Sequence, residues 1–145
     1  MDELKLAKSL IKKFRTNDPF EICECLDYTV LSVPLSGVRG FCQHYAGNSI
    51  VYLREDLPDH VKRFVCGHEL GHAIMHTGTN EIYMDTRTFL KTSIYERQAD
   101  KFSVNLIYPD DDYFMDFQGF SISKIAKCLD LDEWLIEYRL KCLNK

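Results

Sequence analysis

The chain has 145 residues, of which 46% are hydrophobic and 28% are charged, and its formal net charge is −4 at pH 7. This length fits one domain with a buried core of its own, and the composition is that of an ordinary globular protein. The negative charge argues against a protein whose main task is to bind nucleic-acid phosphates, because such proteins need a basic surface.

Two features of the sequence predict a cytoplasmic protein with reduced thiols. No apolar run is typical of a signal peptide, and none is long enough to span a membrane. Six cysteines are present, and in a cytoplasmic protein we expect them to be reduced and mostly buried as small hydrophobic side chains. The Cys23-Glu24-Cys25 spacing differs from that of a zinc ribbon and no second pair follows, so we expect no cysteine metal site.

The first third of the chain predicts two helices and a small sheet. Residues 3–14 place apolar side chains at helical spacing, and we expect this basic amphipathic helix to pack on its own domain. Asp18-Pro19 is typical of a helix start and predicts a short helix that ends near Leu26. Strand-like stretches follow at 28–34, 39–45 and 49–54. A hairpin turn at Ala46-Gly47-Asn48 is expected between the last two.

The rest of the chain predicts helices. A long helix opens at Pro58 and runs to about His76, and a second covers roughly 94–107, where Pro109 and the three aspartates after it end the helix. Residues 121–143 are typical of two short helices. We therefore expect a single domain over 1–145. Its parts would be N-terminal helices and sheet at 1–57, the two long helices with the candidate site at 58–109, and C-terminal helices at 110–145.

The segment His68-Glu69-Leu70-Gly71-His72 lies in the first long helix. Positions i and i+4 of a helix stand on one face, one turn apart, so two imidazoles there can bind a single metal ion. The Glu69 carboxylate then lies beside them, where it can act as a general base on the attacking water. Both histidines fall within the apolar stripe of the helix, which predicts that they point into the protein.

Two glycines in the interior of this helix, Gly67 and Gly71, support a close approach to its backbone. Each costs about 1 kcal/mol of helix stability relative to Ala, a cost that is easier to understand if something must come close. An alternative to the metal site remains, in which His68 and His72 are buried histidines hydrogen-bonded in a core. A third ligand decides between the two interpretations.

A glutamate on the second long helix is the candidate third ligand. The position ten residues after His68 is Gly78, so the pattern with three histidines does not apply. Glu96 and Asp100 share one helix face, and Ala99 beside them permits close helix packing. Glu96 would complete a zinc site of two His and one Glu, while Asp100 would accept a hydrogen bond from a ligand histidine. The alternative is a solvated acidic face.

Further residues are candidates for contacts with a substrate. His76 lies one turn beyond His72, and three roles are open for it. It could support a ligand histidine, contact the substrate or be an ordinary histidine at a helix end. Tyr95, Tyr83 and His76 are the candidates for stabilising the oxyanion. The extended segment Ile50-Val51-Tyr52-Leu53 is a candidate edge strand to which a substrate backbone could add itself.

Three segments match motifs of one known family, at 68–76, 96–102 and 106–109. Together they resemble the ImmA/IrrE family of metallopeptidases, which typically shows His-Glu-Leu-Gly-His, then Glu-x-x-Ala-Asn/Asp-x-Phe-Ala, then Leu-Leu-Met-Pro. Residues 122–140 are similar to the closing helix pair of that family. The departures are Ser103, where Ala is usual, and Tyr108 in place of Met, and neither is a candidate ligand.

The resemblance implies both a fold and a function. The implied fold is α+β, a mainly helical zincin-like domain with a small antiparallel three-stranded sheet beside the His-Glu-x-x-His helix and a C-terminal helix pair. By carry-over, His68, His72 and Glu96 are expected to bind one zinc ion. Glu69 would be the base, and Asp100 would hold a ligand histidine. The expected reaction is gluzincin-like peptide-bond hydrolysis, and the expected partner is a helix-turn-helix repressor of a prophage or mobile element.

Two other functions stay open from the sequence. One is a zinc-stabilised regulatory module that binds a partner protein with little turnover. The other is a DNA-binding regulator that uses the helices at 121–143. From residue 121 onward, however, five basic residues stand against four acidic ones, so we do not expect direct nucleic-acid binding.

Overall fold

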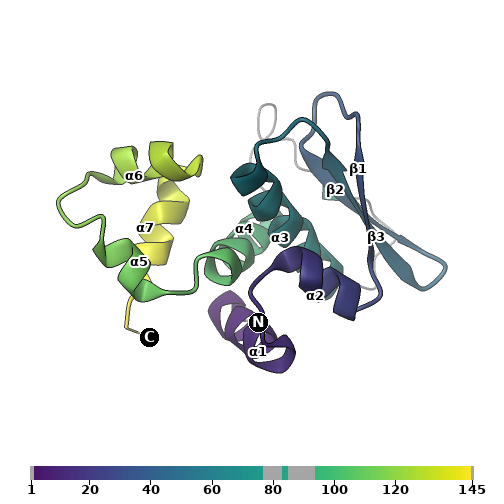
Figure 1. Ribbon diagram of the computed structural model, residues 1–145, viewed down its shortest axis with the longest axis horizontal. Helices are drawn as coiled ribbons and strands as arrows, with labels where there is room; N and C mark the ends of the chain where they lie inside the picture. Colours follow the sequence, from purple (N-terminus) through teal and green to yellow (C-terminus); the bar gives the residue numbers. More distant parts are fainter. Residues whose placement is uncertain (1, 77–82, 85–93, 145) are drawn as a thin grey trace.

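The computed structural model describes residues 2–76, 83–84 and 94–144, with only the backbone described at 83–84. Its helices are α1 (Glu3–Phe14), α2 (Pro19–Cys25), α3 (Asp59–Met75), α4 (Ile94–Ile107), α5 (Asp111–Met115), α6 (Ile122–Leu129) and α7 (Glu133–Lys141) (Figure 1). Its strands are β1 (Thr29–Val33), β2 (Gly40–Tyr45), β3 (Asn48–Arg54) and β4 (Tyr83–Met84). The predicted α+β class is confirmed, and every predicted helix and strand is present. Within these residues, no helix has both the length and the apolar character needed to cross a membrane.

The sheet is mixed, with strand order β1-β3-β2-β4. Strands β2 and β3 form the predicted antiparallel hairpin, but β1 runs parallel to β3, and the short β4 pairs with the free side of β2. The prediction of an antiparallel three-stranded sheet was therefore wrong in topology. The tight turn after Tyr45 determines only the β2–β3 pairing, whereas the position of β1 depends on packing.

Strand β3 lies at the centre of the sheet, which corrects a second prediction. The segment Ile50-Val51-Tyr52-Leu53 pairs with β1 on one side and with β2 on the other. Val51 and Leu53 are fully buried. This segment therefore presents no open edge to which a peptide could add itself.

Helix α3 is the central element of the core. Its neighbours are the sheet through β2 and β3, and the helices α2 and α4. Figure 1 shows the sheet on one side of α3 and α4 on the other. Ten consecutive residues of α3, from Phe64 to Ala73, are buried. Any polar side chain within that stretch is therefore held in water-poor surroundings, where a hydrogen-bond partner or an ion must satisfy it.

The glycines of α3 allow close contact with α4. A Cβ atom built on Gly71 would lie 2.9 Å from Phe102 Cδ2 and 3.4 Å from Ala99 Cα. A Cβ atom on Gly67 would lie 3.2 Å from the Cβ of Ser103 and closer still to its hydroxyl oxygen. That hydroxyl also donates a hydrogen bond of 2.7 Å to the Phe64 carbonyl. The backbone approach that the glycines predicted is therefore that of helix α4.

We expect Gly67→Ala to lower the free energy of unfolding by about 1–3 kcal/mol, because overpacking against Ser103 outweighs the gain in helix propensity. Adding Ser103→Ala should remove the obstructing oxygen. The double variant should therefore lose less free energy of unfolding than the sum of the losses in the two single variants. Urea unfolding of the four proteins measures this. A Gly67→Ala protein as stable as the unmodified chain would contradict the close approach.

The C-terminal helices contain one element that the sequence analysis missed. The aspartates after Pro109 were expected only to end α4, but they also start the short helix α5. The Asp110 side chain accepts a hydrogen bond of 2.9 Å from the Asp112 amide, as a helix cap does. Acidic residues in a first helical turn are favourable because they face the positive end of the helix dipole.

The six cysteines are all free, and four of them are buried, as expected.

Candidate metal centre

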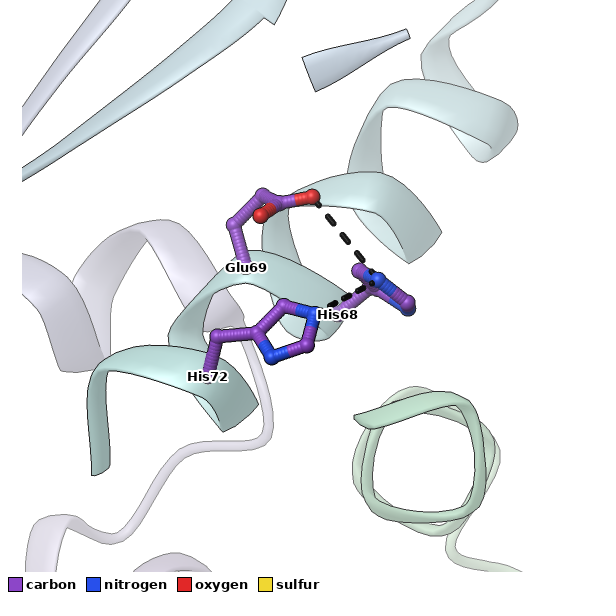
Figure 2. Close-up of side chains that lie close together, drawn as sticks. All are labelled: His68, Glu69 and His72. Carbon is purple, nitrogen blue, oxygen red and sulfur yellow. Dashed lines mark hydrogen bonds and ion pairs between the residues drawn. The ribbon is translucent and has the colours of Figure 1, made fainter. Parts of the chain in front are cut away.

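Helix α3 places two imidazoles and a carboxylate close together in the core. His68, Glu69 and His72 are all fully buried. The two histidines stand one turn apart, with 3.1 Å between their Nε2 atoms. Figure 2 shows the Glu69 carboxylate pointing toward the His68 ring, and its Oε2 lies 3.8 Å from His68 Nε2. The candidate ligand atoms of these three residues lie within 4.8 Å of one another.

Helix α4 brings a second carboxylate to the same point. Glu96 Oε1 lies 2.8 Å from His72 Nε2, and Glu96 Oε2 lies 3.0 Å from His68 Nε2. The carboxylate of Glu69 is farther from His68 than that of Glu96 is. Geometry therefore selects Glu96 rather than Glu69 as the candidate third ligand and leaves Glu69 beside the centre.

Asp100 lies on the same face of α4, one turn after Glu96, and contacts the outer side of His68. Its Oδ1 is 2.7 Å from His68 Nδ1, and both side chains are buried. An Nδ1–H group that donates to this carboxylate leaves the lone pair of Nε2 directed at the point where the ligands converge.

His76, the next histidine along the helix, contacts the outer side of His72. It is only 6% exposed, its Nδ1 is 2.8 Å from His72 Nδ1, and its Nε2 is 2.9 Å from Gln98 Oε1. Both ring nitrogens of His76 thus lie against protein groups. Gln98 was not among the predicted site residues. Two residues apart on a helix, Glu96 and Gln98 share no face, so no periodic pattern links them.

The two tyrosines predicted to contact a substrate lie on different elements, Tyr95 on α4 and Tyr83 on β4. The Tyr95 ring lies 4.3 Å from the His76 ring, centroid to centroid, and Tyr95 is 44% exposed. The backbone of Tyr83 pairs with Cys42 in the sheet, but the side chain of Tyr83 lies outside the described residues. The structure therefore brings Tyr95 to the edge of the histidine cluster.

The surroundings shift the pKa values of the candidate ligands in different directions. Burial lowers the pKa of His72 to about 4, so this ring is neutral near pH 7. Burial also lowers the pKa of His68, but Asp100 and Glu69 outweigh it and raise this pKa well above its usual value. Burial raises the pKa of Glu96, but its close contacts with the two histidines lower it overall. A cation at this centre would compete with the proton on His68.

The donor set fits a zinc ion. Two imidazole nitrogens and a carboxylate converge with separations of 2.8–3.1 Å between donor atoms. Tetrahedral zinc with ligands at about 2.0–2.1 Å sets its donors about 3.3 Å apart, so only a small outward movement of the three side chains is needed. Imidazole and carboxylate ligands are also those that catalytic zinc sites use, with one position left open.

Comparison with known proteins relates the chain to peptidases. The family model described as the IrrE N-terminal-like domain matches residues 23–127, which include every candidate ligand. The metallopeptidase ImmA of Bacillus subtilis is 28% identical over 139 residues, covering 92% of this chain and 81% of that protein. A second relative, the "uncharacterized immunity region protein 2" of Bacillus phage phi105, is 34% identical over 105 residues. That match covers 72% of this chain and 66% of the phage protein, just under two thirds of its length.

Proposed function

This chain belongs to the ImmA/IrrE family, through its IrrE N-terminal-like domain, and from that membership we propose that it is a zinc-dependent endopeptidase. In this proposal His68, His72 and Glu96 bind one zinc ion and Glu69 is the general base. The supporting observation is the convergence of the three donor groups within 2.8–3.1 Å, with a buried carboxylate beside them. The family resemblance that the sequence motifs predicted is confirmed.

The roles of the side chains follow from their positions. A bound zinc ion would lower the pKa of a water molecule toward about 7 and polarise the scissile carbonyl group. Glu69 accepts the proton of the attacking water and passes it to the departing amine, a task for a carboxylate that lies beside the ligands rather than among them. Asp100 accepts a hydrogen bond from the outer nitrogen of His68, so that when zinc displaces the proton of the inner nitrogen, the lone pair left there is directed at the metal position.

For the substrate, we propose a helix-turn-helix repressor of a prophage or mobile element, cleaved in the cytoplasm. The support is the family itself and the name of the phage relative, which places that protein in an immunity region. Cleavage at a defined peptide bond would release the genes that the repressor silences. Co-expression with a helix-turn-helix repressor encoded beside the gene of this chain would test the proposal, with loss of full-length repressor as the readout.

We expect the purified chain to bind one zinc ion, and a strong chelator should stop repressor cleavage until zinc is restored, because two histidines and Glu96 form the site. Glu96→Ala should weaken zinc binding by more than the roughly 10- to 100-fold typical of a lost outer partner. Metal analysis and titration against a zinc-binding dye measure both. Cleavage that continues in chelator with no metal bound would contradict the proposed chemistry.

A further inference from the structure

Three side chains on the outer side of the candidate metal centre contact one another in series, from α4 back to α3. Gln98 contacts His76, and His76 contacts His72, through separations of 2.9 and 2.8 Å. His76 caps the C-terminal end of α3 and is 94% buried, since its exposed fraction is 6%. The contact between His72 and His76 is therefore made in the protein interior, and Gln98, which is half-buried, closes it from the α4 side.

A metal ion bound by His72 Nε2 would set the order of donors and acceptors along this series of side chains. A side-chain amide oxygen only accepts, so Gln98 Oε1 requires a hydrogen on His76 Nε2. A neutral His76 with hydrogen on Nε2 has a lone pair on Nδ1, which accepts from His72 Nδ1–H. His72 then has its own lone pair on Nε2, the atom that faces Glu96 and His68. The opposite order would place a hydrogen where a metal ion needs a lone pair.

We infer that His76 and Gln98 are positioning residues that fix the tautomer and ring orientation of His72 for metal binding. This inference rests on the proposed zinc site and assigns His76 a role other than contact with substrate. His72 thereby obtains an outer partner, as His68 does in Asp100. Each candidate imidazole ligand is thus held by its own hydrogen bond. The α4 residues that support these bonds are Asp100 for His68 and Gln98, through His76, for His72.

The charge of the centre explains why a neutral partner suits His72. The carboxylates of Glu69, Glu96 and Asp100 already face His68 and His72 from two helices. A fourth carboxylate in this buried position would repel the other three, and part of that cost would remain with a divalent ion bound. A neutral imidazole backed by an amide orients His72 without adding negative charge.

A substitution series at His76 tests the inference through zinc affinity. His76→Leu removes the acceptor, so we expect zinc to bind about 10- to 100-fold more weakly, the usual effect of losing an outer partner. His76→Asn places an amide oxygen close to the position of Nδ1, so it should restore most of the affinity. Titration against a zinc-binding dye measures the affinity, and the visible spectrum of the cobalt-substituted protein reports the geometry around the metal.

Gln98 provides a second series that leaves α3 unchanged. Gln98→Glu keeps an acceptor for His76 Nε2–H, and because this position is half-buried, solvent screens much of the added charge, so most of the zinc affinity should remain, whereas Gln98→Met should weaken it. Because Gln98 is only half-buried, its variants decide the question if His76→Leu does not fold. The exposed His60→Asn is the matched control and should bind zinc as the unmodified chain does.

Two results would overturn the inference. One is unchanged zinc affinity in His76→Leu and Gln98→Met. The other is equal loss in His76→Leu and His76→Asn, which would make His76 a ligand itself or a packing residue. Zinc affinity is measured without any substrate, so a chain that binds zinc but cleaves nothing would contradict the proposed peptidase and leave this test intact.

Discussion

Glu69→Gln is expected to lower the rate of repressor cleavage about 10²- to 10⁴-fold, the usual contribution of a general base. The amide has the size and shape of the carboxylate, but it cannot accept the proton of the attacking water. Zinc affinity should stay close to that of the unmodified chain, because Glu96 is nearer to the imidazoles than Glu69 is. Cleavage is measured as loss of full-length repressor over time at saturating zinc.

A matched control separates this effect from a general change of charge. Glu55→Gln makes the same replacement at an exposed position after β3 and should leave both cleavage and zinc binding unchanged. Full cleavage by the Glu69→Gln protein would remove the enzyme proposal and favour a zinc-stabilised module that acts by binding. Loss of zinc together with activity would instead make Glu69 a ligand.

The helices of this fold could be predicted from the sequence because their ends have local signals. Asp2, Asp18 and Ser121 each cap a helix with the side chain, and the ranges expected for α1, α3 and α4 agree closely with those observed. Strand topology has no such signal. Which strand lies next to β3 depends on how the sheet packs on α3, which the alternation of residues along β1 does not specify.

The candidate centre was predictable to the extent that it follows helix periodicity. The i, i+4 spacing brings His68 to His72, and the same spacing on α4 aligns Glu96 with Asp100. The contact of His76 with Gln98 depends instead on how far α3 and α4 are rotated about their axes. Packing determines that rotation, and Gly71 allows the two helices to approach closely.

Arg139 on α7 connects the C-terminal helices to the end of α4. It is only 1% exposed, and it donates hydrogen bonds to the carbonyls of Tyr108 and Pro109 and to the carboxylate of Asp111. Its guanidinium carbon also lies 4.6 Å from the centre of the Phe114 ring. Residues 108–111, which connect α4 to α5, thus depend on one buried cation, while the Asp111 side chain is 38% exposed.

Arg139→Met should therefore lower the free energy of unfolding by about 2–4 kcal/mol, because the carbonyls of Tyr108 and Pro109 lose the charged donor that is buried against them. Asp111→Asn is the matched control. It removes the partly exposed ion pair and one acceptor oxygen, the one that Asn144 N–H now uses, and should cost less than about 1 kcal/mol. Urea unfolding of both variants gives the two values. Equal losses would mean that the ion pair, rather than the two carbonyls, makes Arg139 important. Because α7 contributes no group to the metal centre, zinc affinity should be unchanged in both folded proteins. That result would show that Arg139 stabilises the fold without affecting the metal site.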